Sequence, residues 1–559
     1  MGLVYRLAAA FLGLLLSVFF REVKTRGAYK IPKTGPVIFV AAPHSNQFVD
    51  PVVLFQHCNR EIGFIAAAAS MRKPLVGLLA RLFNSIPVER PQDLTTAGRG
   101  TKPAPLDPLL VTLHGENTHW TTQIAPKDTL DIAGEGYRVA AVMDDTTLQL
   151  AQPLSLRVRT LLADPARAAQ VAWKIRPYVN QETLFAEVTH RLSRGGAVGI
   201  FPEGGSHDRT AFLPLKPGFA IMALSAMASD PACRVAIVPT GLFYFHADRF
   251  RSRAVVEFGD PIAIPPALVA EYAKGGAARR AAVSSLVDQV HLVLKTLTVV
   301  APDLDTLMVL QAARRLYTPI NTRLSLATRC EITRRLMRGY IAHKGHHEVQ
   351  TLEAAVKAYN STLRYYGLRD HEVSQHGHWS RWRALRRFLV GTLRVVFSCV
   401  IVFPGYCIAS PVLQLAVLIA KRKQKEALVA SSVKIRARDV VATWKIMAGM
   451  VLTPVFYLIY TLITFIVTYG VLGLGWHRSV TVCLWEALLI PAVGTLALWY
   501  TDQAIDALRA WYPSLIAAVN PEVTAQIYRT RLHLKRRLEY VIELLGPSVF
   551  EDFEDMRLV

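Results

Sequence analysis

The stretch Val37-Ile38-Phe39-Val40-Ala41-Ala42-Pro43-His44-Ser45-Asn46-Gln47-Phe48-Val49-Asp50-Pro51 decides the fold of this chain. It begins with a short apolar run and ends in a polar turn, which is typical of a buried strand. His44 follows this strand directly, and Asp50 comes a turn or two later. Such a carboxylate can hold the imidazole tautomer, so that the histidine takes a proton from an alcohol. The residues alone leave a second interpretation open, a packed histidine beside a capping aspartate.

The sequence on either side repeats the pattern of strand and helix. Helical patterns such as Pro74–Phe83 and Gly218–Ala228 separate short apolar runs that end in turns. Those runs are Ile62–Ala66, Gly196–Phe201, Arg234–Pro239 and Ala254–Phe258. Strands that alternate with helices predict an α/β domain, which we place at residues 23–267.

Two segments depart from that pattern. Residues 98–157 alternate apolar and polar side chains around turn-like pieces such as Ala133-Gly134-Glu135-Gly136. This predicts a small all-β insertion, in which we identify no chemistry. Residues 268–380 are basic and have helical periodicity, so they predict a helical extension.

The composition indicates a membrane protein. Hydrophobic residues make up 52% of the 559 residues and charged residues only 19%, which excludes a disordered chain. An excess of 64 Lys and Arg over 42 Asp and Glu gives a net charge of +22. Such a charge favours contact with anionic lipid or an anionic substrate. Nucleic acid is the rival partner, but no nucleic-acid-binding motif accompanies the basic clusters, so none is expected. The six scattered cysteines predict free thiols in a reducing compartment.

Long apolar runs predict where the chain meets the membrane. Two runs with almost no charge predict spans at residues 446–475 and 479–500. A third run, residues 388–420, contains Pro404 and Pro411. We expect a re-entrant hairpin there, because proline frees backbone groups that lipid does not satisfy.

Charged residues at the ends of the runs predict the topology. Basic clusters at residues 381–387 and 421–438 flank the third run, and the positive-inside rule places both in the cytosol. Residues 1–22 are apolar and lack a cleavage site, which predicts a membrane anchor or an interfacial helix. Residues 501–559 are expected to form a cytosolic helical tail.

Two further blocks follow strand ends and combine glycine with basic residues. Ile86–Asp93 contains Arg90, and Phe201–Asp208 reads Phe-Pro-Glu-Gly-Gly-Ser-His-Asp, with Arg209 and Lys216 after it. Glycine lets backbone N–H groups approach a phosphate, and a guanidinium group binds it bidentately. A Gly-Gly pair is also a common plain turn, so the residues alone leave both interpretations open.

Taken in order, four blocks resemble the glycerophospholipid acyltransferase superfamily: Pro43–Pro51, Ile86–Asp93, Phe201–Asp208 and Val238–Gly241. The sequence resembles the fungal-type glycerol-3-phosphate/dihydroxyacetone-phosphate O-acyltransferases more closely still. The likeness covers most of the chain, the membrane region included. It implies an α/β acyltransferase domain with the small all-β insertion, the helical extension and C-terminal transmembrane helices.

The resemblance implies an enzyme that transfers a fatty acyl group from acyl-CoA to the sn-1 hydroxyl of a small phosphate. The acceptor is glycerol 3-phosphate, dihydroxyacetone phosphate or both, at the first step of glycerolipid synthesis. His44 is expected to deprotonate the hydroxyl, and Asp50 to orient His44. The implied substrate-binding residues are Arg90, Glu203, Gly204, Gly205, Ser206, Arg209 and Lys216. No metal and no cofactor is expected, since acyl-CoA serves as a co-substrate.

The sequence departs from the superfamily pattern at three places, one of which is Asn84, where the second block usually begins with glycine. Five residues separate His44 from Asp50, one more than in the general superfamily block. Gly205-Ser206-His207 stands where the third block of the superfamily commonly carries an arginine, which leaves the phosphate ligands beyond Glu203 and Gly204 open.

Alternative functions remain beside the one that the resemblance favours. One is acyl transfer to a lysophospholipid, and another is a non-catalytic membrane scaffold that binds lipid. The expected location is the endoplasmic reticulum membrane, with several spans and the catalytic domain facing the cytosol. The oligomeric state and the preferred acyl length are not predicted.

Overall fold

The computed structural model of the chain describes residues 3–98, 104–105, 111–115, 117–163, 173–209, 211–298, 304–317, 326–366, 368, 370, 373, 381–429, 431, 433–550 and 553. Contacts divide the chain into two units. The first unit comprises residues 1–60, 199–224 and 234–559, and the second comprises residues 61–198 and 225–233. Each unit is described by itself.

The first unit contains a mixed sheet with the strand order β1-β14-β13-β2. β13 pairs in parallel with β2 and antiparallel with β14, while β1 pairs in parallel with β14 and β15 lies beside β13. All six side chains of β2 are fully buried, which explains its unbroken apolar run. The strands are Phe20–Arg26 (β1), Val37–Ala42 (β2), Ala236–Tyr244 (β13), Ser252–Phe258 (β14) and Ile262–Ala263 (β15).

Helix α1, Leu3–Phe19, packs against α2, Val49–His57, and against β1. The rings of Tyr5 and Phe55 meet edge to face, with centroids 6.2 Å apart. The opposite side of α1 exposes further apolar side chains, namely Leu7, Phe11, Leu14 and Val18. The expected anchor or interfacial helix therefore packs one apolar face on the domain and exposes apolar side chains on the other. Its role at a membrane stays a prediction.

The second unit contains a parallel pair of strands, β3 (Ile62–Ala67) and β4 (Ile86–Val88). Its helices include α3 (Ala68–Met71), α4 (Pro74–Leu82) and α8 (Glu182–Ser193), and α8 packs against β4. Two more elements, β12 (Ala197–Ile200) and α9 (Gly218–Ser229), belong partly to each unit. Strands alternating with helices are what the sequence predicts for this domain.

The β insertion also lies in the second unit, as a seven-stranded sheet with the order β5-β11-β8-β9-β10-β7-β6. In that order the strands are Thr96–Ala97, Trp173–Arg176, Thr129–Ile132, Glu135–Val142, Thr147–Leu150, Thr112–His114 and Ala104–Pro105. The short helices α5 (Trp120–Gln123) and α6 (Leu156–Ala163) complete it, and Trp120 is buried in its core.

The predicted end of the insertion, residue 157, is too early. β11 pairs antiparallel with β8 after α6, so the sheet closes only at Arg176. A strand of four residues is too short to stand out in the sequence, and its place depends on a partner more than 40 residues away. Residues 99–103, 106–110 and 116 of the predicted insertion lie outside the described residues.

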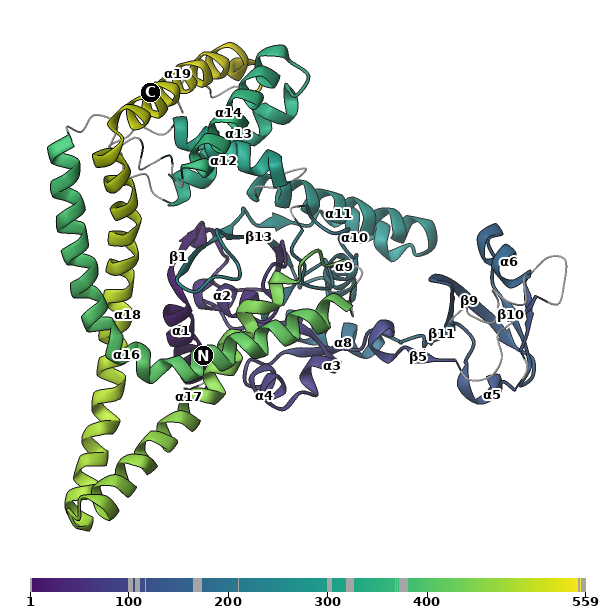
Figure 1. Ribbon diagram of the computed structural model, residues 1–559. Coiled ribbons are helices and arrows are strands. Elements are labelled where there is room, and N and C mark those ends of the chain that lie inside the picture. The colour runs from purple at the N-terminus through teal and green to yellow at the C-terminus, as the bar shows by residue number, and fades with distance from the viewer. Residues whose placement is uncertain are drawn as a thin grey trace. The chain divides into compact units, whose positions relative to one another are not determined.

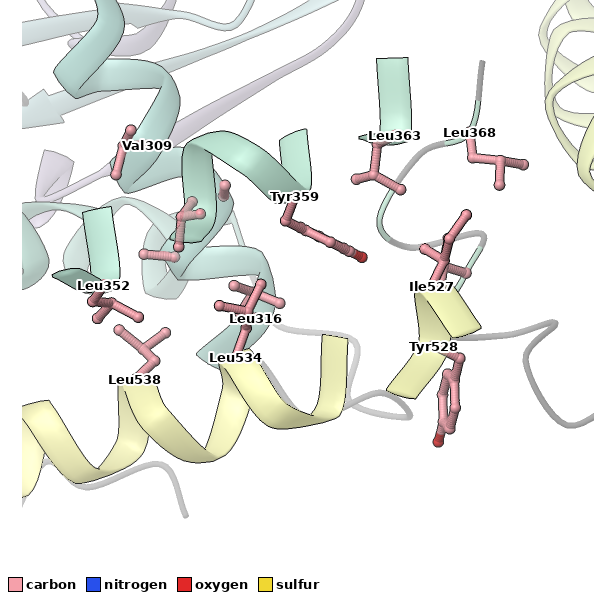
Figure 2. Packing of buried hydrophobic residues seen from close by; sticks show 14 of the residues in the cluster. Val309, Leu316, Leu352, Tyr359, Leu363, Leu368, Ile527, Tyr528, Leu534 and Leu538 are labelled. Atoms are coloured by element: carbon pink, nitrogen blue, oxygen red, sulfur yellow. The ribbon is translucent and has the colours of Figure 1, made fainter. Parts of the chain in front are cut away.

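The helical extension and the C-terminal tail share one core. α10 (Pro266–Ala273) and α11 (Gly276–Leu297) come first, and α12 (Leu304–Tyr317), α13 (Leu326–Ala342) and α14 (His347–Tyr365) follow. The tail helix α19, Pro521–Leu545, packs against α12 and α14. Figure 2 shows Leu534 and Leu538 of α19 beside Leu316 and Leu352. The predicted tail beyond residue 553 lies outside the described residues.

Among the described residues, three helices are long and apolar enough to cross a membrane, so the chain associates with one. They are α16 (Arg381–Val429), α17 (Val441–Ile466, continued by a π-helical turn to Val471) and α18 (Trp476–Val519). α17 with its π-helical turn covers the predicted span 446–475 only as far as Val471, whereas α18 covers all of 479–500 and continues well past residue 500.

The re-entrant hairpin predicted for residues 388–420 is wrong. α16 runs through Pro404 and Pro411 without ending and packs along α18 (Figure 1). At Gly405 the two helices approach so closely that an added Cβ would lie 2.5 Å from Cβ of Ala497. Packing against a neighbouring helix lets a transmembrane helix tolerate proline, which is why the two prolines do not break α16.

Ion pairs join α18 to the sheet of the first unit. Arg251 binds Asp502 through two nitrogen–oxygen contacts of 3.1 and 2.5 Å, and Nη2 of Arg21 lies 2.9 Å from Oδ2 of Asp506. Arg251 also donates to the carbonyl of Ser17 at the end of α1. These contacts place the helix that leaves the apolar region next to the N-terminal strand and helix.

Candidate active site

His44 and Asp50 are brought together where β2 gives way to α2. β2 ends at Ala42, α2 begins at Val49, and Nδ1 of His44 lies 2.8 Å from Oδ2 of Asp50. The turn between them absorbs the additional residue noted in the sequence, and Gln47 lies in it with φ +20°. Asp50 is fully buried, so its carboxylate faces protein groups rather than water.

Two more donors hold the Asp50 carboxylate. The backbone N–H of Asn46 donates to Oδ2 at 2.9 Å, and the hydroxyl of Tyr244 donates to Oδ1 at 2.6 Å. Burial, and then the negative charge of Asp50, raise the pKa of Tyr244 well above its ordinary value. The tyrosine therefore stays protonated and keeps donating to the carboxylate.

This arrangement assigns the proton positions on His44. Asp50 accepts the proton on Nδ1, so Nε2 carries the lone pair of the neutral imidazole. Phe201 stacks on the ring, with centroids 4.1 Å apart and planes 20° apart, and the histidine side chain is 13% exposed. Within the described part of the chain, Nε2 makes no hydrogen bond. The geometry suits a general base that takes a proton from an incoming hydroxyl.

Glu203 and His207 form a second, fully buried carboxylate–imidazole pair behind His44. Oε1 of Glu203 lies 2.9 Å from Nε2 of His207, and Oε2 accepts from the backbone N–H of His44 at 2.6 Å. The N–H of Arg209 donates to Nδ1 of His207, which places the imidazole proton on Nε2. The N–H of His207 in turn donates to the carbonyl of His44 at 2.9 Å. The loop after β12 is thereby fastened to His44 from both sides.

Glu203 differs from its expected role as a substrate ligand. Both of its oxygens accept from protein N–H groups, including that of Leu213 at 3.0 Å, and the residue is buried. A carboxylate in that position would also repel a phosphate. The structure places Glu203 to hold His44 and His207.

Gly204, Gly205 and Lys216 lie on the outer side of the same loop. Gly204 has φ +73°, and a Cβ there would lie 2.4 Å from Nζ of Lys216, so the exposed lysine passes directly over its backbone. A Cβ on Gly205 would meet nothing within 4 Å. The loop therefore presents backbone and an ammonium group to the surroundings, which are the groups that a phosphate needs.

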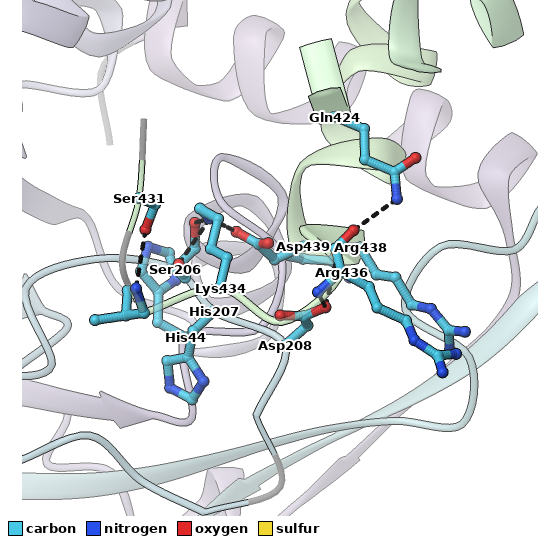
Figure 3. Close-up of polar contacts among 12 residues, drawn as sticks. His44, Ser206, His207, Asp208, Gln424, Ser431, Lys434, Arg436, Arg438 and Asp439 are labelled. Atoms are coloured by element: carbon cyan, nitrogen blue, oxygen red, sulfur yellow. Dashed lines mark hydrogen bonds and ion pairs between the residues drawn. The ribbon is translucent and has the colours of Figure 1, made fainter. Parts of the chain in front are cut away.

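The other predicted ligands divide between the units. Ser206 is buried, and its hydroxyl and carbonyl both contact Lys434 (Figure 3). Nε of Arg209 donates to the carbonyl of Val433. Arg90 belongs to the second unit, where its guanidinium pairs with Asp93 through contacts of 2.7 and 3.0 Å.

Sequence reasoning did not find Tyr244, His207 or Lys434. A signal existed for His207, because a histidine four residues after a carboxylate suits such a pair. Tyr244 stands at the end of a strand-like run, yet nothing in its neighbourhood points to Asp50. Lys434 lies 228 residues from Ser206, so no local pattern predicts their contact.

The described residues contain no group of three or more His, Cys, Asp or Glu side chains suited to a metal ion. The loop groups near His44 are instead hydrogen-bond donors and cations. They suit an anionic substrate rather than a bound cation.

Comparison with protein families matches two parts of the chain. Residues 141–242 match an acyltransferase family model, and residues 309–550 match the model of the glycerol-3-phosphate acyltransferase 2 C-terminal domain. The first match contains the Phe201–Asp208 block. The second contains most of the helical extension, all three long apolar helices and α19.

Curated relatives match along the whole chain. Glycerol-3-phosphate O-acyltransferase 1 of Saccharomyces cerevisiae is 37% identical over 100% of this chain and 73% of its own length. Glycerol-3-phosphate O-acyltransferase 2 of the same yeast is 32% identical over 99% of this chain and 78% of its own length. An uncharacterized acyltransferase of Schizosaccharomyces pombe is 36% identical over 99% of this chain and 83% of its own length.

Among solved structures, the 1-acyl-sn-glycerophosphate acyltransferase PlsC of Thermotoga maritima matches 52% of this chain and 79% of its own chain. The TM-score is 0.26 and the sequence identity 14%. The relatives of full length carry the assignment: this chain belongs to the glycerol-3-phosphate O-acyltransferase family.

Proposed function

We propose that this chain transfers a fatty acyl group from acyl-CoA to the sn-1 hydroxyl of glycerol 3-phosphate, dihydroxyacetone phosphate or both. The products are lysophosphatidate and acyl-dihydroxyacetone phosphate, at the first step of glycerolipid synthesis. The observation that carries the proposal is the His44–Asp50 pair, with Nδ1 held at 2.8 Å and Nε2 left to meet a substrate. Family membership supports the choice of acceptor.

In the proposed mechanism His44 acts first as base and then as acid. Nε2 takes the hydroxyl proton while the oxygen attacks the thioester carbonyl, and Asp50 stabilises the imidazolium that forms. The tetrahedral intermediate collapses, the carbon–sulfur bond breaks, and CoA leaves as a thiolate. A thiol with a pKa of about 8.5 is a good leaving group, and the proton on His44 passes to it. The proton passes from the hydroxyl through His44 to the CoA thiolate, and the acyl group passes directly to the acceptor oxygen. The reaction therefore needs no covalent acyl-enzyme and no cofactor.

We place the phosphate of the acceptor against the Gly204–Gly205 loop. Lys216 supplies a cation over Gly204, and open space at Gly205 allows close approach of the backbone. Arg209, which is exposed next to this loop, adds a second cation. Arg90 is retained as a further ligand on the strength of the family resemblance.

The proposed location is the endoplasmic reticulum membrane with the catalytic domain in the cytosol, and the charge distribution supports the cytosolic orientation. Three basic residues between α16 and α17, Lys434, Arg436 and Arg438, contact the loop that follows β12, so this linker and the catalytic residues share one side. The positive-inside rule assigns such a linker to the cytosol. Glycerol 3-phosphate and acyl-CoA are anionic, whereas the acyl product belongs in the bilayer.

The test is an acceptor assay on the full-length protein in lipid nanodiscs. CoA release from acyl-CoA is measured with glycerol 3-phosphate, dihydroxyacetone phosphate and lysophosphatidate. We expect turnover with either small phosphate, and a loss of at least ~100-fold in His44→Ala. His119→Ala is the matched control, because His119 is exposed and belongs to the second unit.

Two outcomes would overturn the proposal. Preference for lysophosphatidate would assign a lysophospholipid acyltransferase instead. Lipid binding without CoA release from any acceptor, unchanged in His44→Ala, would assign a scaffold.

A further inference from the structure

The segment between the membrane helices α16 and α17 is fastened to the loop that carries Ser206 and His207. Asp208 accepts from the backbone N–H groups of Ile435 at 2.8 Å and Arg436 at 2.7 Å (Figure 3). From the other direction, Nζ of Lys434 donates to the carbonyl of Ser206 at 2.8 Å and to its hydroxyl at 3.2 Å. More than 220 residues of sequence separate the two segments. They therefore meet only when the chain is folded.

Lys434 is held rigidly at this junction. Its side chain is 11% exposed, and it forms a close ion pair with Asp439, which is fully buried. An ammonium group has three N–H donors, and the carbonyl of Ser206, its hydroxyl and the carboxylate of Asp439 provide three acceptors. The orientation of the lysine is therefore determined by protein groups.

The anchor of Asp208 is also strong. Burial alone would raise the pKa of Asp208, but the N–H groups of Ile435, Arg436 and Arg438 outweigh it and hold the pKa below its ordinary value. The carboxylate stays ionised at neutral pH and keeps accepting from the linker.

A short path connects this junction to the base. Ser206 precedes His207, whose N–H donates to the carbonyl of His44 and whose imidazole binds Glu203. Glu203 accepts from the N–H of His44. A shift of Ser206 therefore moves the groups that hold the backbone of His44.

We propose that Lys434 is a positioning residue: it fastens the linker between α16 and α17 to Ser206 and so sets the placement of His44. This proposal rests on the proposed function for its catalytic readout.

The test compares Lys434→Met, Lys434→Arg and the double variant Lys434→Met/Asp439→Asn in nanodiscs. Lys434→Met also leaves the buried Asp439 charge unpaired, and the double variant removes that charge. We expect Lys434→Met to lower kcat by about 10- to 100-fold, with the KM for acyl-CoA changed less than about threefold. Lys434→Arg should keep most of the wild-type kcat, because arginine keeps the positive charge. The double variant should recover the melting temperature but not kcat.

Arg436→Ala is the matched control, because Arg436 contacts Asp208 through its backbone and its side chain is exposed. It should keep the wild-type kcat. Recovery of kcat together with the melting temperature in the double variant would show that Lys434 only neutralises Asp439, and would overturn the proposal. So would a wild-type kcat in Lys434→Met.

A measurement that does not need acyl transfer tests the positioning role of Lys434 independently of the proposed function. Carbethoxylation of His44 is followed by peptide mass spectrometry, with the exposed His119 as internal reference. We expect the His44 rate to change severalfold in Lys434→Met while the His119 rate stays constant. An unchanged His44 rate overturns the positioning role whichever acceptor the wild type uses. A changed rate, together with no turnover of glycerol 3-phosphate by the wild type, supports positioning and counts against the proposed function alone.

Discussion

The hydroxyl of Tyr244 lies 2.6 Å from Oδ1 of Asp50, while His44 binds the other oxygen of the same carboxylate. The tyrosine comes from the end of β13, and the aspartate from the first turn of α2. β13 pairs in parallel with β2, so the sheet register brings Tyr244 to the end of the strand that precedes His44. The orienting carboxylate is thus itself oriented from a neighbouring strand.

Tyr244→Phe is expected to lower kcat about 10-fold in the CoA-release assay. The change removes the hydrogen bond that orients Asp50, so Asp50 holds His44 less well in the position that the transition state needs. A loss of 1.4 kcal/mol in transition-state stabilisation corresponds to about tenfold in rate. Tyr29→Phe is the control, because Tyr29 is 86% exposed. A Tyr244→Phe enzyme with the wild-type kcat would falsify a catalytic contribution of this hydrogen bond.

Contacts between residues close in the sequence could be predicted, whereas contacts between distant residues could not. His44 and Asp50 are six residues apart across the turn between a strand and a helix, so the sequence offers the pair as one of two interpretations. Tyr244 lies 194 residues from Asp50, and Lys434 lies 228 residues from Ser206. Those two contacts depend on sheet register and on the docking of a membrane linker, which no local pattern contains.

The fold shows the same division. Strand and helix alternation, the β insertion and the apolar runs have local periodicities, and the structure contains each of them. The hairpin expected at Pro404 and Pro411 fails because packing of α16 on α18 outweighs the local preference of proline. α19 packs with α12 and α14 in one core, through contacts between residues that lie about 200 positions apart in the sequence. The sequence therefore indicates each helix but not which helices pack together.

The contact of Asp208 with the linker predicts a pH dependence of stability. Its folded pKa is below its ordinary value, so the stabilisation is present above the unfolded pKa of about 3.9 and is lost as the pH falls through the folded value. Asp208→Asn should lower the melting temperature at pH 7, and the difference from the wild type should shrink below about pH 4. Melting in detergent from pH 7 to pH 3 measures this. Glu426→Gln, at an exposed site in the same region, should melt as the wild type does.

Arg531 and Asp370 form a buried ion pair in the helical region. Nε of Arg531 lies 3.1 Å from Oδ1 of Asp370, the arginine is 2% exposed, and Tyr359 donates to the same oxygen. Arg531→Met leaves a buried carboxylate without its cation, which should destabilise the folded state by about 3–5 kcal/mol. Adding Asp370→Asn removes the charge but keeps the acceptor for Tyr359, so it should restore most of the stability. Chemical denaturation of the two variants checks this; equal destabilisation of the single and double variants would contradict it.

Gly339 lies within α13, beside an apolar cavity of about 160 Å³ that α12, α14 and α19 also line. A Cβ at this position would meet nothing within 4 Å. Glycine inside a helix costs about 0.5–1 kcal/mol relative to alanine, so Gly339→Ala should raise the melting temperature by about 1 °C without loss of activity. Gly134 is the contrasting control, because its added Cβ is equally unobstructed but its φ is +85°. Gly134→Ala should destabilise the β insertion by about 1 kcal/mol. A shift of the melting temperature in the same direction in both variants would contradict the prediction, because the two glycines are expected to differ in backbone conformation.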